Sequence, residues 1–558
     1  MRKFIYTIFV SCIASAAAAE LPVLRPVGDK WLLHVDGAPY PILGGHVMNS
    51  SSFDPEWMDS VFDRVKEFHG NTLITAISWQ AVEPEEGKFD FSLVDSLVKQ
   101  ARARDMRLVM LWFGTWKNAR SFYVPEWVKT DMDRFKRMEN SDGGRLEVIS
   151  NLCEEANAAD TRAYVEFMRH LKMIDGDENT VIMVQIQNEV GLLGDTRDRS
   201  EAAQRAFKAQ VPAELIESLV KNKERLTHHL KQVWALRGYQ EKGTWSEVFG
   251  EGIETDEIFM AWHFARYINR MAEAGEAVHN LPMYVNGWLG QLEVGVPGKI
   301  PSGGPVARVM DVWKAGAPNL ELLAADIYAF YKMRCAEFSR DDNPLFVPEA
   351  CALWLGDRWS GPAKAFYTIA EMQGIGFAPF GIDHEHYESN HPIGVAYAAL
   401  ENLKPVIVRH LGTENLRGFF KEGKETGTSI TSGPYQFNMT YQPLLEDCYG
   451  LIIRNGENEF IFAGNGARIV FAPENPKNHP GISITLVEEG KLDAKGVFQR
   501  KRLVGGDEMI GTAGIKLPAH GYDLSHHRNN MSIQRVRLYL HPPRMSGAAQ
   551  GTDTTPEF

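Results

Sequence analysis

Cysteine, cationic charge and long apolar runs are all scarce in this chain. Its 558 residues contain five cysteines, and Lys+Arg number 59 against 72 for Asp+Glu, which gives a formal net charge of −13. So few cysteines exclude a disulfide framework, although the count is compatible with a single bridge. No basic run has the character of a phosphate-binding track, so nucleic acid is not an expected partner.

The N-terminus contains an apolar run. Arg2 and Lys3 precede residues 4–13, and a run of alanines ends at Ala19. This is the layout of a signal peptide over residues 1–19, and the run is too short to span a bilayer. Lipidation of Cys12 is the alternative. We therefore expect a secreted, periplasmic protein with no integral membrane segment. Its other cysteines lack zinc-site spacing: Cys153, Cys335, Cys351 and Cys448.

Short apolar runs alternate with amphipathic segments from Tyr40 onward, a pattern typical of βα units and a parallel sheet. Eight runs are strand candidates: residues 41–43, 72–77, 108–112, 181–186, 282–285, 320–327, 345–347 and 375–380. Eight such strands favour a closed (β/α)8 TIM barrel over residues 20–408, with an open doubly wound sheet as the alternative. The long interval between the fourth and fifth strands predicts an insertion above the barrel mouth that shapes a substrate cleft.

The pattern changes after residue 408. Short alternating apolar runs between Gly and Asn turns predict a separate antiparallel, sandwich-like β-domain over residues 409–545. The small, polar residues 546–558 predict a flexible tail.

Two glutamates follow predicted strands and carry the chemistry. Glu189 comes directly after the fourth strand, and Glu349 ends the seventh. Carboxylates at these positions face the mouth of a barrel. A facing pair is what glycosidic bond cleavage requires, since one carboxyl protonates the leaving oxygen while the other attacks or activates water. The alternative for either residue alone is a helix cap or an arginine pair.

These residues resemble a known family. Asn188-Glu189 and Glu349 are similar to the catalytic pair of the clan of retaining (β/α)8 glycosidases, and residues 79–91 resemble the segment after strand two in family 35 and family 42 β-galactosidases. The β-domain resembles that of a bacterial branch of family 35. The resemblance implies that Glu189 is the general acid/base and Glu349 the nucleophile. It also implies that Asn188 binds the sugar 2-hydroxyl, with a loop-capping asparagine as the alternative.

Other residues are candidates for substrate binding near the strand ends. Tyr328 is predicted to donate to Glu349 or to be a rim residue, and Asn118 and Asp383 are predicted polar contacts. A metal cluster at residues 383–386 is the alternative for Asp383, but two carboxylates need no cofactor or metal. Tryptophans near strand ends are predicted to form the floor of the sugar pocket or to pack in the core: Trp79, Trp112, Trp116, Trp288 and Trp354.

Together these features predict a retaining exo-β-galactosidase that releases terminal galactose from plant-type oligosaccharides or polysaccharide side chains, with galactosylated xyloglucan as a candidate substrate. Another retaining activity of the clan, of the endo-glucanase or mannanase type, is the first alternative. A carbohydrate-binding protein that has lost catalysis is the second. The sequence does not give the oligomeric state.

Overall fold

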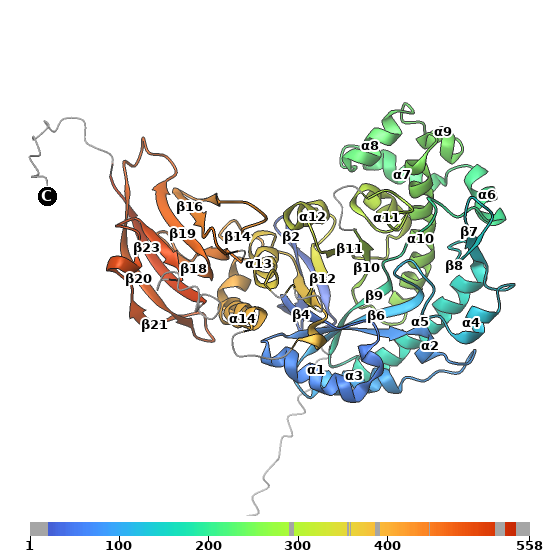
Figure 1. The fold of residues 1–558 in the computed structure, drawn as a ribbon, viewed down its shortest axis with the longest axis horizontal. Helices are drawn as coiled ribbons and strands as arrows, with labels where there is room; N and C mark the ends of the chain where they lie inside the picture. The colour runs from blue at the N-terminus through green and yellow to red at the C-terminus, as the bar shows by residue number, and fades with distance from the viewer. Residues whose placement is uncertain are drawn as a thin grey trace, which may run out of the picture.

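The computed structural model describes residues 20–289, 295–353, 357, 359–385, 391–445, 447–518 and 531–542. Its centre is a closed barrel of parallel strands in the order β10-β11-β12-β13-β4-β5-β6-β9 (Figure 1). All eight predicted strands are present, which confirms the closed barrel and excludes the open sheet. They are β4 (Ile42–His46), β5 (Thr72–Ser78), β6 (Arg107–Lys117), β9 (Val181–Asn188), β10 (Met283–Trp288), β11 (Leu322–Ile327), β12 (Phe346–Ala352) and β13 (Gly376–Phe380).

Helices cover the outside of the barrel, so the strands are buried on both faces and read as continuous apolar runs. The helix that covers each strand follows it in the chain. In the order of the strands these helices are α1 (Pro55–Glu67), α3 (Ser92–Arg102), α5 (Glu154–Asp175), α10 (Ile253–Glu276), α11 (Met310–Gly316), α12 (Tyr331–Phe338), α13 (Gly361–Phe366) and α14 (Pro392–His410). Shorter elements lie in the loops after β5 and β6: α2 (Trp79–Val82), α4 (Glu126–Thr130), β7 (Arg137–Glu139) and β8 (Arg145–Ile149).

A small antiparallel sheet, not predicted from the sequence, precedes the barrel. It consists of β1 (Val23–Val27), β2 (Lys30–Val35) and β3 (Ala38–Pro39). Leu33 and Val35 of β2 join the apolar cluster that fills the barrel interior, together with Ile42, Val109 and Ile182 from the strands. The sheet therefore packs against the barrel interior and extends its core.

The predicted insertion is present between β9 and α10. It contains α6 (Glu201–Lys208), α7 (Ala213–Lys221), α8 (His228–Ala235) and α9 (Trp245–Phe249). In Figure 1 helices α7 to α9 project from the barrel beside α11. The backbone N–H of Thr227, just before α8, donates to Asp311 of α11 over 2.7 Å, which ties the insertion to the barrel.

The C-terminal region forms two antiparallel sheets, in the orders β14-β17-β18-β23-β20-β21 and β15-β16-β19-β22. Phe437 of β16 meets Phe462 of β18 edge to face, with ring centroids 5.5 Å apart, so the two sheets share one apolar core. The strands are β14 (Leu416–Phe420), β15 (Gly427–Ser432), β16 (Tyr435–Tyr441), β17 (Tyr449–Arg454), β18 (Glu459–Asn465), β19 (Ala467–Pro473), β20 (Ile482–Leu492), β21 (Phe498–Leu503), β22 (Gly514–Leu517) and β23 (Ser532–Leu540).

The β-domain contacts the barrel at the start of α12. The backbone N–H of Tyr331 donates to Glu422 over 2.6 Å, and the Lys332 ammonium pairs with Glu425 over 2.5 Å. Phe420 of β14 packs edge to face against Tyr331. These contacts anchor the turn at Tyr331 and Lys332. Tyr328, three residues before Tyr331, directly follows β11. The β-domain is therefore attached next to the C-terminal end of a barrel strand.

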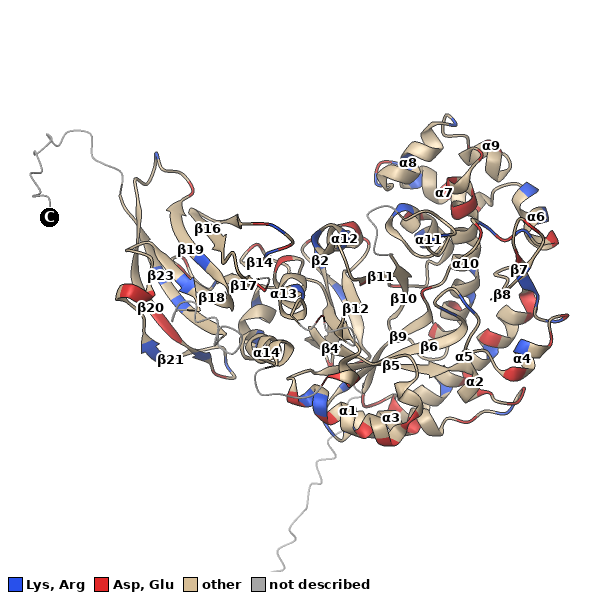
Figure 2. Cartoon of the chain, in the orientation of Figure 1, with Lys and Arg blue, Asp and Glu red and all other residues tan. Residues whose placement is uncertain are grey.

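Cys153, Cys335, Cys351 and Cys448 are all buried and free. Within the described residues, no helix has both the length and the apolar character needed to cross a membrane. Lys and Arg are interspersed with Asp and Glu along both domains (Figure 2). The predicted signal peptide and flexible tail lie outside the described residues.

Candidate active site

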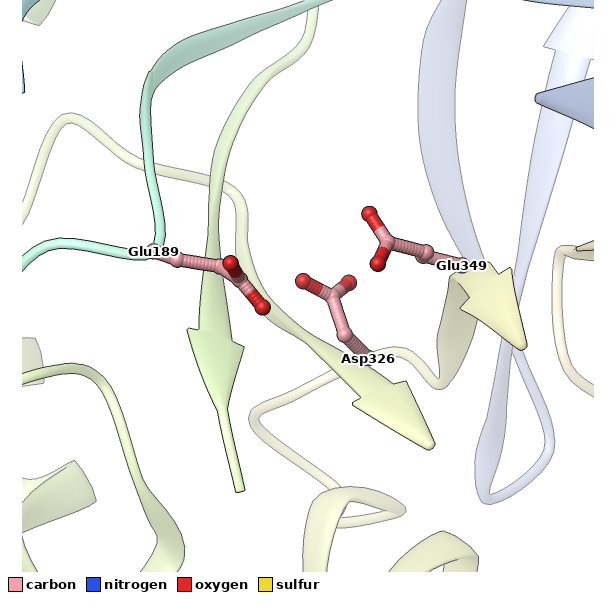
Figure 3. Close-up of side chains that lie close together, drawn as sticks. All are labelled: Glu189, Asp326 and Glu349. Atoms are coloured by element: carbon pink, nitrogen blue, oxygen red, sulfur yellow. The ribbon is translucent and has the colours of Figure 1, made fainter. Parts of the chain in front are cut away.

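Three carboxyl groups converge at the C-terminal end of the barrel (Figure 3). Glu189 follows β9 directly, Asp326 lies near the end of β11, and Glu349 lies in β12. All three side chains are buried, and one oxygen of each lies within 4.8 Å of an oxygen of the others. The barrel thus brings together the two glutamates that the sequence places far apart, and adds a third acid between them.

The chain around Glu189 fixes its side chain. The residue has a φ of +45°, in the left-handed region that non-glycine residues avoid and that is common at functional sites. Its backbone N–H donates to Oδ1 of Asn286 over 2.9 Å, and Oε2 accepts from Nδ2 of Asn118 over 2.6 Å. Asn118, predicted to bind substrate, therefore contacts Glu189 in this structure.

Glu349 is held through one of its two oxygens. Oε1 accepts a hydrogen bond from the Tyr328 hydroxyl over 2.5 Å, while Oε2 has no hydrogen-bond donor among the described residues. Nδ1 of His46 lies 3.8 Å from Oε2 but is bonded to the carbonyl oxygen of Pro348 at 3.0 Å. Burial lowers the pKa of His46, so the imidazole is neutral near pH 7. Oε2 of Glu349 can therefore accept a hydrogen bond from another group.

Asn188 presents an unused donor beside the two glutamates. Its side chain is 1% exposed, and Oδ1 accepts from the Lys117 ammonium over 2.8 Å. Nδ2 has no partner among the described residues. A buried amide N–H without a partner costs free energy, so this group is suited to a hydrogen-bond acceptor on a ligand.

The electrostatics of the site favour the protonated form of Glu189. Burial raises the pKa of Glu189 to about 7, the charge of Glu349 adds to this effect, and the Lys117 ammonium opposes it. One protonated and one ionised carboxyl are what acid-assisted nucleophilic attack requires. One oxygen of each glutamate lies within 4.8 Å of one oxygen of the other, so the two carboxyl groups are close enough to act on one bond.

Three of the candidate tryptophans pack in the core, which is the alternative given for them above. Trp79, Trp112 and Trp116 are 0% exposed. Their indole N–H groups donate inside the protein, to Glu83, Asp160 and the carbonyl oxygen of Ile149 respectively. No face of these rings is open to a sugar because each belongs to the packed core around the strands. Trp288, half-buried at the end of β10, stays a prediction, and Trp354 lies outside the described residues.

Asp383 serves as a connector in this structure. Its carboxylate accepts from the backbone N–H of Met48 over 3.0 Å and from the Ser51 hydroxyl over 2.5 Å. Arg64 of α1 donates to its carbonyl oxygen. It thereby joins the ends of β13 and β4. Among the described residues the acidic group that could hold a metal is Glu189, Asp326 and Glu349, and His386 of the alternative cluster lies outside them.

Sequence reasoning missed Asp326, Lys117 and Asn286 as parts of the site. Asn286 binds both the backbone of Glu189 and, through Nδ2, Oδ2 of Asp326 over 2.6 Å. Asp326 is an acid inside an otherwise apolar strand, and Lys117 ends a similarly apolar strand. Charged or amide side chains within buried strands were the signal that could have identified all three residues.

Comparison with known proteins adds sequence similarity to this geometry. Residues 49–250 match the Beta-galactosidase family model. This is the family 42 type, so membership of family 35 in particular remains a prediction. The matched region contains β5, β6, β9 and Glu189 but ends before Asp326 and Glu349. Residues 393–513, which span most of α14 and much of the β-domain, match a domain of unknown function (DUF5597).

Two curated relatives are also β-galactosidases. Beta-galactosidase 8 of Oryza sativa subsp. japonica is 27% identical over 189 residues, which are 33% of this chain and 26% of the relative. Beta-galactosidase of Xanthomonas manihotis is 29% identical over 100 residues, covering 17% of this chain and 16% of the relative. The chain therefore spans about a quarter or less of the length of these relatives.

Similar solved structures include the catalytic domain of β-amylase from Paenibacillus polymyxa, at 13% identity and a TM-score of 0.43, covering 61% of this chain and 92% of that one.

Proposed function

We propose that this protein is a retaining exo-β-galactosidase. The observation that carries the proposal is the convergence of Glu189 and Glu349, from different barrel strands, on one buried site with oxygens within 4.8 Å. The raised pKa of Glu189 supports its role as the acid. The match of residues 49–250 to the β-galactosidase family supports the choice of galactose.

In the proposed double displacement each group has one task. Glu349 attacks the anomeric carbon while Glu189 gives its proton to the leaving oxygen, which leaves a glycosyl ester and an ionised Glu189. Glu189 then takes a proton from water, the water oxygen displaces the ester, and Glu349 regains its charge. Tyr328 holds Oε1 of Glu349, which leaves Oε2 as the oxygen without a hydrogen-bond donor among the described residues.

The unpartnered amide of Asn188 supports a role in stabilising the transition state. Lys117 donates to the amide oxygen of Asn188, and Nδ2 is left as a hydrogen-bond donor for a ligand. A hydrogen bond to the sugar 2-hydroxyl strengthens as positive charge develops at the anomeric carbon. We therefore assign Asn188 to that hydroxyl.

The finer substrate is a plant-type galactosylated oligosaccharide or polysaccharide side chain, with galactosylated xyloglucan as the first to test. The insertion between β9 and α10 supports exo action because elements of this kind close one side of a barrel mouth. The leader-like residues 1–19 support export to the periplasm.

A substitution at Glu189 tests the proposal. Glu189→Ala should lose most activity on substrates with poor leaving groups, yet retain much more on activated aryl galactosides, which need little protonation. Azide should rescue the activated substrate as a galactosyl azide of retained configuration. Equal loss on both substrates without rescue would remove Glu189 from the acid role.

Product analysis with the unchanged protein separates the finer alternatives. Galactose as the first product from galactosylated xyloglucan supports exo action. Internal fragments from β-glucan or mannan, without galactose release, would instead favour the endo-acting alternative. Binding without turnover of any of these would favour a carbohydrate-binding protein.

A further inference from the structure

The carboxyl group of Asp326 lies between those of Glu189 and Glu349 (Figure 3). Asp326 is 2% exposed, and it is paired with Glu349 across the parallel strands β11 and β12, which fixes the spacing of the two residues. Like charges this close in a buried site cannot all be ionised, because water does not screen their repulsion. A cluster of this kind must therefore hold protons.

The neighbours of Asp326 limit where those protons lie. Oδ2 accepts from Nδ2 of Asn286 over 2.6 Å, whereas Oδ1 has no donor among the described residues. Lys117 from β6 is the cation that acts on the group, and its ammonium donates to Asn188 instead. A proton on Oδ1 of Asp326 would satisfy this oxygen. It would supply a donor beside Glu189, with which the Asp326 side chain is in hydrogen-bond contact, and beside Glu349, which has an oxygen within 4.8 Å of the Asp326 carboxyl.

The remaining titratable groups around Asp326 carry no compensating charge. Tyr284 of β10 and Tyr328 after β11 have pKa values raised by burial, so both phenols are neutral. His46 of β4 is neutral because burial lowers its pKa. The Lys117 ammonium acts on Glu189 and Asp326, and its single positive charge cannot balance three ionised carboxyl groups.

We propose that Asp326 remains a neutral carboxylic acid throughout turnover and donates its hydrogen bond to whichever glutamate is charged. The proposal rests on the retaining mechanism proposed above. Before attack, the acceptor is Oε2 of Glu349. After attack, Glu349 is a neutral ester and Glu189 has lost its proton to the leaving group, so Asp326 turns to Glu189. Hydrolysis of the ester reverses the exchange.

The exchange conserves protons and charge. In the first step one proton leaves Glu189 for the leaving oxygen, one C–O bond forms at Glu349 and one breaks, and the negative charge passes from Glu349 to Glu189. Asp326 neither gains nor loses a proton. Burial, followed by the charges of Glu349 and Glu189, holds the pKa of Asp326 well above its usual range, in agreement with this role. Asp326 is therefore a positioning residue that acts through the two glutamates.

Infrared spectroscopy tests the protonation state without requiring turnover. Spectra of the wild type and Asp326→Asn are compared at pH ~8.5, where a carboxyl with a pKa of about 7 is mostly ionised. We expect the wild type to show one more carbonyl stretch of a protonated carboxylic acid than the variant. Identical spectra in this region would show that Asp326 is ionised and would overturn the proposal. This comparison remains valid even if the protein hydrolyses no galactoside.

Kinetic pH profiles test the hydrogen bond itself. Asp326→Asn keeps a neutral donor, so we expect kcat/KM within about 10-fold of the wild type and an unmoved alkaline limb. Asp326→Leu keeps the branched shape of the side chain but has no donor, so the anionic form of Glu189 loses stabilisation and the alkaline limb should move to higher pH. A shift of the alkaline limb to lower pH in Asp326→Asn would mean that the substitution had removed a negative charge, which contradicts the proposal. Identical profiles for all three proteins would contradict it too.

Discussion

The hydroxyl group of Tyr328 donates to Oε1 of Glu349 over 2.5 Å, from the residue directly after the strand next to that of the nucleophile. Tyr328 follows β11 and Glu349 belongs to β12, and the parallel register places Asp326 opposite Glu349. The hydrogen bond orients the carboxylate and stabilises its charge.

Tyr328→Phe should therefore slow turnover without unfolding the protein. A hydrogen bond to a charged group contributes about 1.5–3 kcal/mol, so we expect kcat to fall roughly 10- to 100-fold. Steady-state kinetics on an aryl galactoside measure the loss. Tyr435→Phe removes a hydroxyl bonded within the β-domain and serves as the matched control. A kcat for Tyr328→Phe within about twofold of the control would mean that the contact has no role in catalysis.

The pH dependence follows from the raised pKa of Glu189. The acid must be protonated in the free enzyme, so kcat/KM should fall as the pH rises through about 7. The Lys117 charge lowers this pKa, so Lys117→Met should move the alkaline limb to higher pH, by about one unit. Lys495→Met, an exposed site in the β-domain, should leave the limb in place. A shift of the limb to lower pH in Lys117→Met would contradict the assigned effect of Lys117 on the pKa of Glu189.

The barrel was predictable because its signals are local. Each strand is a short apolar run bounded by turn residues, and Glu189 and Glu349 stand where such runs end. The β1–β3 sheet escaped prediction because its half-exposed strands carry weak apolar patterns. Because such patterns report only on neighbouring residues, the sequence could not show which side chains at strand ends point into the site.

The tryptophans and Asp326 illustrate this limit in opposite directions. Trp116 and Trp79 stand near strand ends but turn into the core, since their indole N–H groups find acceptors there. Asp326 stands inside an apolar strand and was assigned no role, yet it lies between the two glutamates. Both outcomes depend on packing between elements distant in sequence, which no local pattern encodes.

The contact between Glu422 and Tyr331 predicts that the β-domain supports the active site. Tyr331 is 1% exposed, so Glu422→Ala leaves a buried N–H without an acceptor, at a cost of about 1–3 kcal/mol in the free energy of unfolding. Urea unfolding followed by tryptophan fluorescence measures this cost. The anchored turn follows Tyr328, so kcat should fall as well. Glu457→Ala, an exposed site in the same domain, is the control. Equal stability and equal kcat for the two variants would show that the contact supports neither.

The central claim is that Glu349 bonds covalently to galactose, and a mechanism-based trap tests it most directly. A 2-deoxy-2-fluoro-galactosyl donor with a good leaving group slows both steps, and its glycosyl ester accumulates because breakdown passes through a similarly cationic transition state. Mass spectrometry of the digested protein should place the adduct on Glu349, which lies within 4.8 Å of the acid that assists the attack. Glu349→Gln should not be labelled, and the glucosyl and mannosyl analogues should label the wild type poorly. An adduct on Glu189 or another residue, or time-dependent inactivation without any adduct, would contradict the account.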